Sequence, residues 1–246
     1  MLILLPPSEG KTAPTRGAPM KLEALAFAAD LTESRRKLLA ALAALADLPL
    51  ERAVSMLAVS AGQAGEVAVD AGLRSAPAGP AAEVYTGVLY DRLRLPELPK
   101  RCQGRVLIAS ALWGVVRPAD RIPYYRFSAK AKLDGIGGLA AFWRPALTAA
   151  LPDKEGALVV DMRSGAYSAA WKPKRADLLA VRAFSEVKGK RKPVSHMAKA
   201  VRGEVARALL EAKNPPETPE AAATIAERAG HTVELAPGNL DVIVPG

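Results

Sequence analysis

Polar side chains that could do chemistry gather at the start of the chain, directly after an apolar run. Residues 6–12 read PPSEGKT. The GKT triplet resembles the end of a phosphate-binding P-loop, but that loop needs a glycine where Leu5 stands, so we expect no Walker-type site. Polar residues that follow a buried strand nevertheless occupy the place where α/β proteins often bind ligands. The candidate site residues of this turn are Ser8, Glu9 and Lys11.

A second polar group follows another apolar run, in the sequence VDMRSGAY at residues 160–167. Asp161, Ser164 and Tyr167 can converge on a ligand if the apolar run is a strand that ends there. A carboxyl such as Glu9 or Asp161 could act as a general acid or base on a C–N bond, although these residues do not select a reaction. Tyr85 and Thr86 are further polar candidates for such a pocket.

Two arginines are candidates for binding phosphate. Arg117 lies in the sequence LWGVVRPAD at residues 112–120, and Arg126 follows shortly after. The planar guanidinium group suits phosphate because it donates two parallel hydrogen bonds. For Arg117, a structural pair with Asp120 across the turn is equally consistent with the sequence.

Residues 132–139, KLDGIGGL, resemble the hairpin of a helix-hairpin-helix module. Glycines let backbone N–H groups approach a phosphate at the start of the next helix, whose dipole favours anions. Lys130, Lys132 and Arg144 add positive charge on either side. The alternative interpretation is an ordinary glycine-rich loop. Lys172, in the sequence WKPKR at residues 171–175, is a further candidate cation.

His196, Lys199 and Arg202 are spaced by three residues in a predicted helix, and therefore lie on neighbouring parts of its surface. His196 could transfer protons, but a single histidine is thin evidence for catalysis. No cysteine or histidine stands near it in the sequence, and the second histidine is His231. We therefore expect no metal centre and no cofactor.

The positive charge of the chain is concentrated in its middle. The formal net charge is +9, yet residues 1–100 hold 11 basic and 11 acidic side chains. Residues 101–213 hold 22 basic and 9 acidic side chains, a net of +13, and residues 214–246 have a net of −4. Concentrated positive charge favours a polyanionic partner, since each neutralised phosphate releases counterions. A solvated basic face without a partner remains the alternative.

The elements that must position these residues alternate along the chain. The sequence predicts strands at 2–5, 105–110, 157–162 and 178–187 and a closing pair at 231–235 and 240–244, with a basic hairpin tip at 188–192. It predicts helices at 32–47, 51–60, 83–93, 138–151, 195–213 and 219–229. This interleaving predicts an α/β or mixed α+β fold, in one compact domain over residues 1–246 with a central mixed sheet flanked by helices.

Composition excludes several classes of protein. The single cysteine, Cys102, rules out an internal disulfide bond. The first residues have no basic segment of the kind that begins an export signal, and no apolar run approaches the roughly 20 residues of a membrane span. We therefore expect a cytoplasmic protein with no membrane partner. The sequence does not determine the oligomeric state.

Several of these motifs recur, in this order and with this spacing, in a known family. The chain resembles the YaaA peroxide-stress proteins from residue 1 to residue 246. The first turn departs from the family pattern, because PSEGK stands here where many relatives have PAK. The shared motifs are MLILL at the start, Lys11-Thr12, Tyr85-Thr86-Gly87, LWGVVRPAD at 112–120, Phe142-Trp143, Ser164 with Tyr167, Lys172-Pro173, Ala198-Lys199 and Arg202-Gly203.

The resemblance implies a compact α/β domain with an unusual fold, a basic cleft and a helix-hairpin-helix-like element. It also implies protection from hydrogen peroxide, through limiting free iron and the DNA damage that iron promotes. Members of the family are described as binding DNA, with a preference for distorted or branched duplexes.

The leading hypothesis is therefore a peroxide-stress protein that binds DNA by structure rather than by sequence. The alternative is an enzyme that acts on a nucleotide or nucleobase in a polar pocket at the strand ends. That pocket would be formed by Ser8, Glu9, Lys11, Tyr85, Thr86, Asp161, Ser164 and Tyr167. Direct iron storage is disfavoured by the poor supply of ligands. The residues expected to line a DNA-binding cleft are Arg117, Arg126, Lys130, Lys132, Lys172, Lys199 and Arg202.

Overall fold

A central sheet organises the molecule. A computed structural model describes residues 1–187, 190–193 and 196–245. In this part of the chain eight strands form one sheet, in the order β4-β3-β1-β6-β7-β10-β9, with β8 paired to β7. The strands are β1 (Leu2–Leu5), β3 (Val106–Ser110), β4 (Gly114–Val116), β6 (Leu158–Asp161), β7 (Asp177–Val187), β8 (Lys190–Pro193), β9 (Thr232–Ala236) and β10 (Asn239–Pro245), while β2 (Gly79–Pro80) and β5 (Arg121–Ile122) form a separate pair.

The five inner strands β3, β1, β6, β7 and β10 run parallel, and β4, β8 and β9 are antiparallel to their neighbours. β1 lies between β3 and β6, where Ile3 pairs with Val106 on one side and with Val160 on the other. Strands of a parallel sheet are covered on both faces, which explains why β1, β3 and β6 are almost continuous apolar runs. The mixed α/β fold predicted from the sequence is confirmed.

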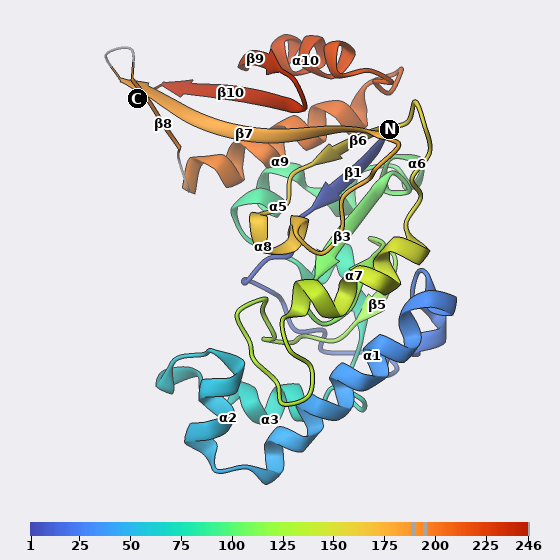
Figure 1. The fold of residues 1–246 in the computed structure, drawn as a ribbon, viewed down its shortest axis with the longest axis vertical. Helices are drawn as coiled ribbons and strands as arrows, with labels where there is room; N and C mark the ends of the chain where they lie inside the picture. The colour runs from blue at the N-terminus through green and yellow to red at the C-terminus, as the bar shows by residue number, and fades with distance from the viewer. Residues whose placement is uncertain (188–189, 194–195, 246) are drawn as a thin grey trace.

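Helices pack around the sheet, with α5 and α9 behind it and α9 crossing β7 (Figure 1). Among the described residues, none of the helices is both long and apolar enough to cross a membrane. The helices are α1 (Ala28–Ala43), α2 (Leu50–Leu57), α3 (Glu66–Ala71), α4 (Ala81–Val84), α5 (Val88–Leu93), α6 (Lys100–Gln103), α7 (Leu139–Ala150), α8 (Gly165–Ser168), α9 (His196–Glu211) and α10 (Pro219–Arg228), with short 3₁₀ turns at Leu22–Ala24, Ala44–Asp47, Ala61–Gln63 and Leu95–Glu97.

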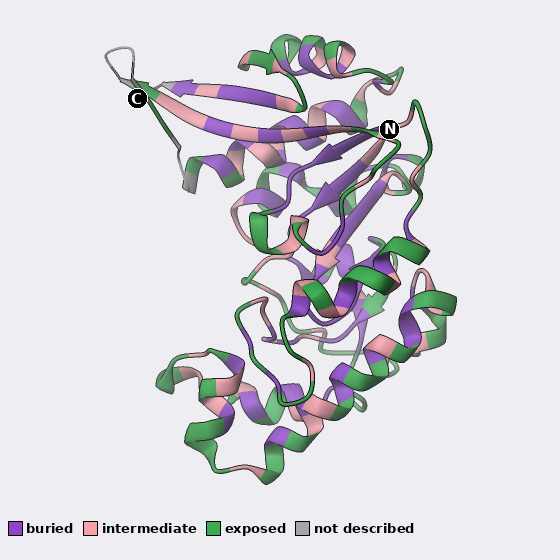
Figure 2. Cartoon of the chain, viewed as in Figure 1, coloured by how far each residue is buried: buried purple, intermediate pink, exposed green. Residues whose placement is uncertain are grey.

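One cluster of buried hydrophobic side chains runs through the fold, from Ile3 in β1 to Val244 in β10. Figure 2 shows the inner strands as almost wholly buried, whereas the outward faces of α1 and α2 are exposed. Gly203 in α9 lies so close to α5 that a side chain there would meet the carbonyl of Leu89. This close approach holds α9 and α5 together beside the sheet.

The predicted helix at 83–93 is wrong in one respect, because it is broken into α4 and α5. Between them, Tyr85 forms an isolated β-bridge with Lys11, and Gly87 adopts a φ of +95°. A positive φ is accessible to glycine and interrupts a right-handed helix. The break follows from pairing with the first turn, which a helical periodicity cannot reveal.

The described residues do not confirm the predicted helix-hairpin-helix element. The glycine-rich turn at residues 134–138 leads into α7, but the described residues 123–133 before it contain no helix. Of the predicted basic hairpin tip, residues 188 and 189 lie outside the described residues, and residues 190–193 form β8.

Candidate functional site

A cavity of about 510 Å³ opens beside the carboxyl ends of β1 and β6. Carboxyl ends of parallel strands are the usual ligand-binding edge of an α/β sheet. The walls come from six separate parts of the chain: the turn after β1, the segment after α2, the start of α5, the loop at 126–130, the segment around α8, and α9. The lining residues are Pro6, Pro7, Ser8, Glu9, Gly10, Lys11, Ala58, Val59, Gly87, Val88, Leu89, Tyr90, Arg126, Phe127, Ser128, Lys130, Ser164, Tyr167, Lys199 and Arg202.

The polar turn after β1 is held in place by backbone hydrogen bonds to the segment between α4 and α5. The amide of Thr12 donates to the carbonyl of Val84 at 2.8 Å, and the amide of Thr86 donates to the carbonyl of Gly10 at 3.1 Å. The positive φ of Gly87 then turns the chain so that α5 starts at the cavity wall. The pairing of these two segments, which are distant in the sequence, therefore forms this side of the site.

Lys11 is the most unusual cation of the cavity. Its ammonium Nζ donates to the carbonyl of Ser8 at 2.6 Å and lies 4.4 Å from the centre of the Tyr125 ring. Burial and, to a smaller extent, the nearby positive charge of Arg126 together lower the pKa of Lys11 to about 8. A substantial fraction of this amine is therefore neutral at slightly alkaline pH.

Two carboxyl groups of α3 lie under the loop that carries Arg126. The backbone amide of Arg126 donates to Asp70 Oδ1 at 2.8 Å, and the hydroxyl of Tyr124 donates to Glu66 Oε1 at 2.8 Å. Burial raises the pKa of Asp70 to about 7, against the opposing effects of the amide and of Lys11. The second oxygen of each carboxyl is buried and, among the described residues, has no hydrogen-bond partner.

The sequence hypothesis missed these two carboxyl groups. Glu66 and Asp70 are spaced by four residues and so share one face of α3, which is the only signal the sequence offers. The charges of these two carboxyl groups raise the pKa of Lys11, which lies about 55 residues earlier in the chain, in the turn after β1. Only the packing of the two segments brings them together.

A layer of tyrosines lies beneath the cavity. The hydroxyls of Tyr85 and Tyr125 are 2.7 Å apart, and the hydroxyl of Ser110 is 2.8 Å from that of Tyr125. Tyr90 stacks on Tyr85, with ring centres 5.6 Å apart, and its hydroxyl donates to the carbonyl of Pro6 at 2.7 Å. Tyr85 is therefore a buried support for the site rather than part of its surface.

The remaining cations of the cavity differ in exposure. Lys130 and Lys199 are exposed, whereas Arg126 and Arg202 are half-buried. Arg126 donates from Nη1 to the carbonyl of Glu9 at 2.9 Å, and its Nη2 lies 3.7 Å from the Glu9 carboxylate. Arg202 donates from Nε to the carbonyl of Val181 in β7 at 3.0 Å. The cavity therefore has lysines at its mouth and anchored guanidinium groups further in.

The structure brings together nine of the residues that the sequence singled out, and it places others elsewhere. Asp161 lies in a buried ion pair with Arg163, at 2.8 Å, which makes it a structural anchor. Arg117 lies 5.6 Å from the ring of Phe27, and its backbone amide, not its side chain, binds Asp120. The nine lining residues are Ser8, Glu9, Lys11, Arg126, Lys130, Ser164, Tyr167, Lys199 and Arg202.

Three further candidates, Thr86, Lys132 and Lys172, contribute to no wall of the cavity. Thr86 acts through its backbone amide, as described above, and the backbone amide of Lys132 donates to the carbonyl of Met56 at 2.7 Å. Lys172 is exposed beyond the cavity. His196 is the first residue of α9, and its side chain lies outside the described part of the structure.

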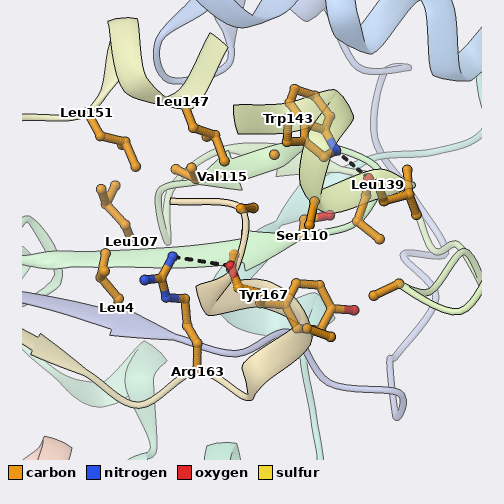
Figure 3. A pocket seen from close by; sticks show the side chains of 17 residues that line it. Leu4, Leu107, Ser110, Val115, Leu139, Trp143, Leu147, Leu151, Arg163 and Tyr167 are labelled. Atoms are coloured by element: carbon orange, nitrogen blue, oxygen red, sulfur yellow. Dashed lines mark hydrogen bonds between the residues drawn. The ribbon is translucent and has the colours of Figure 1, made fainter. Parts of the chain in front are cut away.

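A second cavity lies between α7 and the sheet (Figure 3). It measures about 20 Å³, enough for about one water molecule, so it is a packing gap rather than a ligand site. Its walls are mostly apolar, and the indole of Trp143 donates to the carbonyl of Ala111 at 2.7 Å. Tyr167 lines both cavities, and its partly buried side chain packs against the hydrophobic core.

Within the described residues, no group of three histidine, cysteine, aspartate or glutamate side chains is arranged to hold a metal ion. The single cysteine, Cys102, is buried with its thiol free.

Sequence comparisons place the chain among known proteins. A UPF0246 protein of Streptomyces coelicolor is 43% identical over 259 residues, covering 99% of this chain and 98% of the relative. A UPF0246 protein of Corynebacterium efficiens is 40% identical with the same coverage, and an uncharacterised protein of Campylobacter jejuni is 35% identical over 53% of each chain. The family model described as "Peroxide stress protein YaaA" matches residues 1–233, and the chain therefore belongs to that family.

Proposed function

We propose that this member of the peroxide-stress family binds DNA by its structure rather than its sequence, with the phosphates held at the mouth of the cavity. The observation that carries the proposal is the charge of the lining: five cations from three separate segments accompany one carboxylate, that of Glu9. Cations that converge from distant segments suit a ligand with several phosphates.

The distribution of exposure supports the same proposal. Lys130 and Lys199 are exposed and can reach phosphates without a rearrangement, whereas Arg126 and Arg202 are held by backbone carbonyls. None of the helices in the described residues is rich in Asn, Gln and Arg as a base-reading helix would be, which favours contacts to the DNA backbone. Affinity that depends on phosphates falls steeply with salt, by about three decades between 50 and 200 mM when six or more are contacted.

A Lys130→Ala/Lys199→Ala double variant tests this proposal. We expect weaker binding to a short duplex and a salt slope that is smaller by about 2, because each lost phosphate contact lowers the slope by about 0.9. Gel-shift or anisotropy titrations at several salt concentrations measure both quantities. The matched control is Lys21→Ala/Lys100→Ala, which removes two exposed lysines outside the cavity. No binding by the unaltered protein at 50 mM salt, or equal slopes for both variants, would contradict the proposal.

Protection of DNA is the biological consequence we propose. Bound protein limits the access of iron and peroxide to the DNA backbone, and so reduces iron-dependent strand breaks. Supercoiled plasmid treated with ferrous iron and peroxide should be nicked more slowly with the unaltered protein than with the double variant. Equal protection by both proteins would contradict the proposal that DNA binding is the cause of the protection.

Two buried groups, Lys11 in the wall of the cavity and Asp70 under the loop that carries Arg126, favour a second candidate function, an enzyme that acts on a nucleotide or nucleobase. Lys11 has its pKa lowered to about 8, and Asp70 has its pKa raised to about 7, which places both near neutral pH. Such groups suit proton transfer, and their occurrence beside a cavity is typical of active sites. Incubation with nucleoside monophosphates, followed by chromatography for released base, tests this candidate directly.

Binding of any phosphate-bearing ligand in the cavity should weaken as the pH rises through 8. The free protein loses the Lys11 proton near pH 8, and a bound anion holds that proton to higher pH. The affinity therefore falls by up to about tenfold per pH unit above 8. The other charged groups that act on the pKa of Lys11 are Arg126, Asp70, Glu9 and Glu66.

Duplex affinity measured between pH 7.5 and 9.5 checks this dependence. A Lys11→Arg variant keeps the positive charge throughout this range, because an arginine does not lose its proton there. Its affinity should be flatter above pH 8 than that of the unaltered protein. A steep fall that persists in Lys11→Arg would assign the dependence to another group.

A further inference from the structure

Lys11 is a half-buried lysine that pairs with no carboxylate among the described residues. Its Nζ donates to the carbonyl of Ser8 at 2.6 Å. The carboxylate of Glu9, two residues earlier, lies 3.7 Å from Nη2 of Arg126 instead. A lysine that is withdrawn from water for structural reasons is almost always paired. Packing alone therefore does not explain why an amine stands at this position.

The backbone holds this amine at the wall of the cavity. Lys11 forms a β-bridge with Tyr85, which fixes the turn that carries it. Its Nζ lies 4.4 Å from the ring centre of Tyr125 and 5.8 Å from that of Tyr85. Lys11 also lines the cavity of about 510 Å³. The amine is therefore fixed against an aromatic floor and is accessible to a molecule in the cavity.

The surroundings of Lys11 favour the neutral amine. Burial and the charge of Arg126, from the loop at 126–130, keep its pKa at about 8, against the opposing charges of Asp70, Glu9 and Glu66. At pH 7.5 about a quarter of this amine is neutral, compared with about 0.1% of an exposed lysine. The neutral form is the one that attacks a carbonyl carbon, as lysines that form Schiff bases do.

The same cavity offers binding groups for a phosphate. Lys130 and Lys199 are exposed, and Arg126 and Arg202 are half-buried, and all four line the cavity with Lys11. A volume of about 510 Å³ lies within the range of roughly 300–1,000 Å³ that holds small ligands. A small phosphorylated molecule can therefore bind these cations and present a second functional group to Lys11.

We propose that Lys11 forms an imine with a small phosphorylated aldehyde, such as an open-chain sugar phosphate, whose phosphate is bound by the cations of the cavity. This activity goes beyond the proposed DNA binding and does not require DNA. An aldehyde is the functional group that a neutral lysine captures reversibly, and the phosphate is the group that the surrounding guanidinium and ammonium groups bind.

The reaction needs only the amine, the aldehyde and a proton. The lone pair of Nζ forms a bond to the carbonyl carbon, the π electrons move to the oxygen, and a proton passes from Nζ to that oxygen. The hydroxyl then takes up a second proton and leaves as water, while the nitrogen lone pair forms the C=N bond. Water in the open cavity carries these protons. The protonated imine retains its positive charge near the ring face of Tyr125, which favours a cation.

Reductive trapping tests the proposal on the unaltered protein. Glyceraldehyde 3-phosphate and cyanoborohydride are added at pH 7.5, and peptide mass spectrometry locates the adduct, which has the mass of one probe less one oxygen. Because of its larger neutral fraction, we expect Lys11 to be labelled at least about tenfold faster than the exposed lysines. Equal labelling of Lys11 and the exposed lysines, or no label on Lys11, would overturn the proposal and leave the proposed DNA binding intact.

Two variants and a second probe complete the test. Lys11→Arg keeps the charge but cannot form the imine, so it should lose the fast label, whereas Lys21→Arg, which changes an exposed lysine outside the cavity, should retain it. Glyceraldehyde, which lacks the phosphate, should label Lys11 about tenfold more slowly at the same concentration, and inorganic phosphate should slow only the phosphorylated probe. Equal rates for the two probes would overturn the assignment of a phosphorylated substrate.

Discussion

A Gly203→Ala variant should unfold at a markedly lower temperature than the unaltered protein. Gly203 is buried in α9, where a Cβ atom would overlap the carbonyl oxygen of Leu89 in α5 and lie 2.9 Å from the Cβ of Arg92. Backbone of one helix cannot rotate away from backbone of another, so the two helices must separate. Overpacking of this kind costs about 3 kcal/mol, which lowers the midpoint of unfolding by roughly 6–12 °C in a chain of this size.

Thermal unfolding followed by circular dichroism measures this effect. The matched control is Gly62→Ala, since a Cβ at Gly62 meets nothing within 4 Å and its φ is not positive. We expect this control to change the stability by no more than about 0.5 kcal/mol. Equal unfolding midpoints for Gly203→Ala and the unaltered protein would contradict this prediction, because α9 and α5 could then move apart without a loss of stability.

The same substitution should also disturb the cavity. Lys199 and Arg202 lie on the turn of α9 directly before Gly203, and Leu89 also lines the cavity. A change in the distance between the two helices moves these cations relative to the start of α5. Gly203→Ala protein that is still folded at low temperature should therefore bind duplex more weakly than Gly62→Ala.

An Asp70→Asn variant should be more stable than the unaltered protein at pH 8, and no more stable near pH 4. The folded state holds the Asp70 proton up to about pH 7, whereas the unfolded state releases it near 3.8. The unaltered protein therefore loses stability as the pH rises from about 4 to about 7, and the loss is complete above 7. Asparagine cannot ionise, and its side-chain oxygen can still accept from the amide of Arg126.

The size of this effect follows from the shift in pKa. A difference of about 3 units corresponds to about 4 kcal/mol at most. Urea unfolding at pH 4, 6 and 8 measures the free energy of unfolding for both proteins. A gain that is equal at all three values of pH, or absent at pH 8, would show that Asp70 does not carry this proton.

Asp153 supplies a control of opposite sign. Three backbone amides, those of Lys174, Arg175 and Ala176, donate to its carboxylate and lower its pKa. Its stabilising effect is therefore present above the unfolded pKa and disappears as the pH falls. Asp153→Asn should reduce stability at pH 8, whereas Asp70→Asn should increase it.

Local pattern was sufficient for most of the secondary structure. The strand at 2–5 is a short apolar run closed by two prolines, and the strand at 157–162 is observed as Leu158–Asp161. The helix at 219–229 begins after Thr218, whose hydroxyl accepts from the amide of Ala221, as a capping threonine does. Prolines, caps and apolar periods act within a few residues, and sequence reveals them.

The break at Tyr85–Gly87 required tertiary information. Residues 83–93 have the periodicity of one helix, but the bridge from Tyr85 to Lys11 competes with it. The missing first helix of the hairpin before α7 has a related cause, since the amide of Lys132 bonds to the carbonyl of Met56 instead of to its own segment. In both places, contacts with a segment distant in the sequence determine the local backbone structure.

By itself the sequence determined most of the inner strands, the polar turns after β1 and β6, and the concentration of cations from which Lys130, Lys199 and Arg202 come. Residues that follow parallel strands meet at one edge of the sheet, which is why these predictions converged on one cavity. Only the tertiary structure decided that Asp70 lies beside Lys11 and that Asp161 is sealed in an ion pair. The reason is physical: burial and the charges of distant neighbours set the protonation of a group, and both depend on how the chain packs.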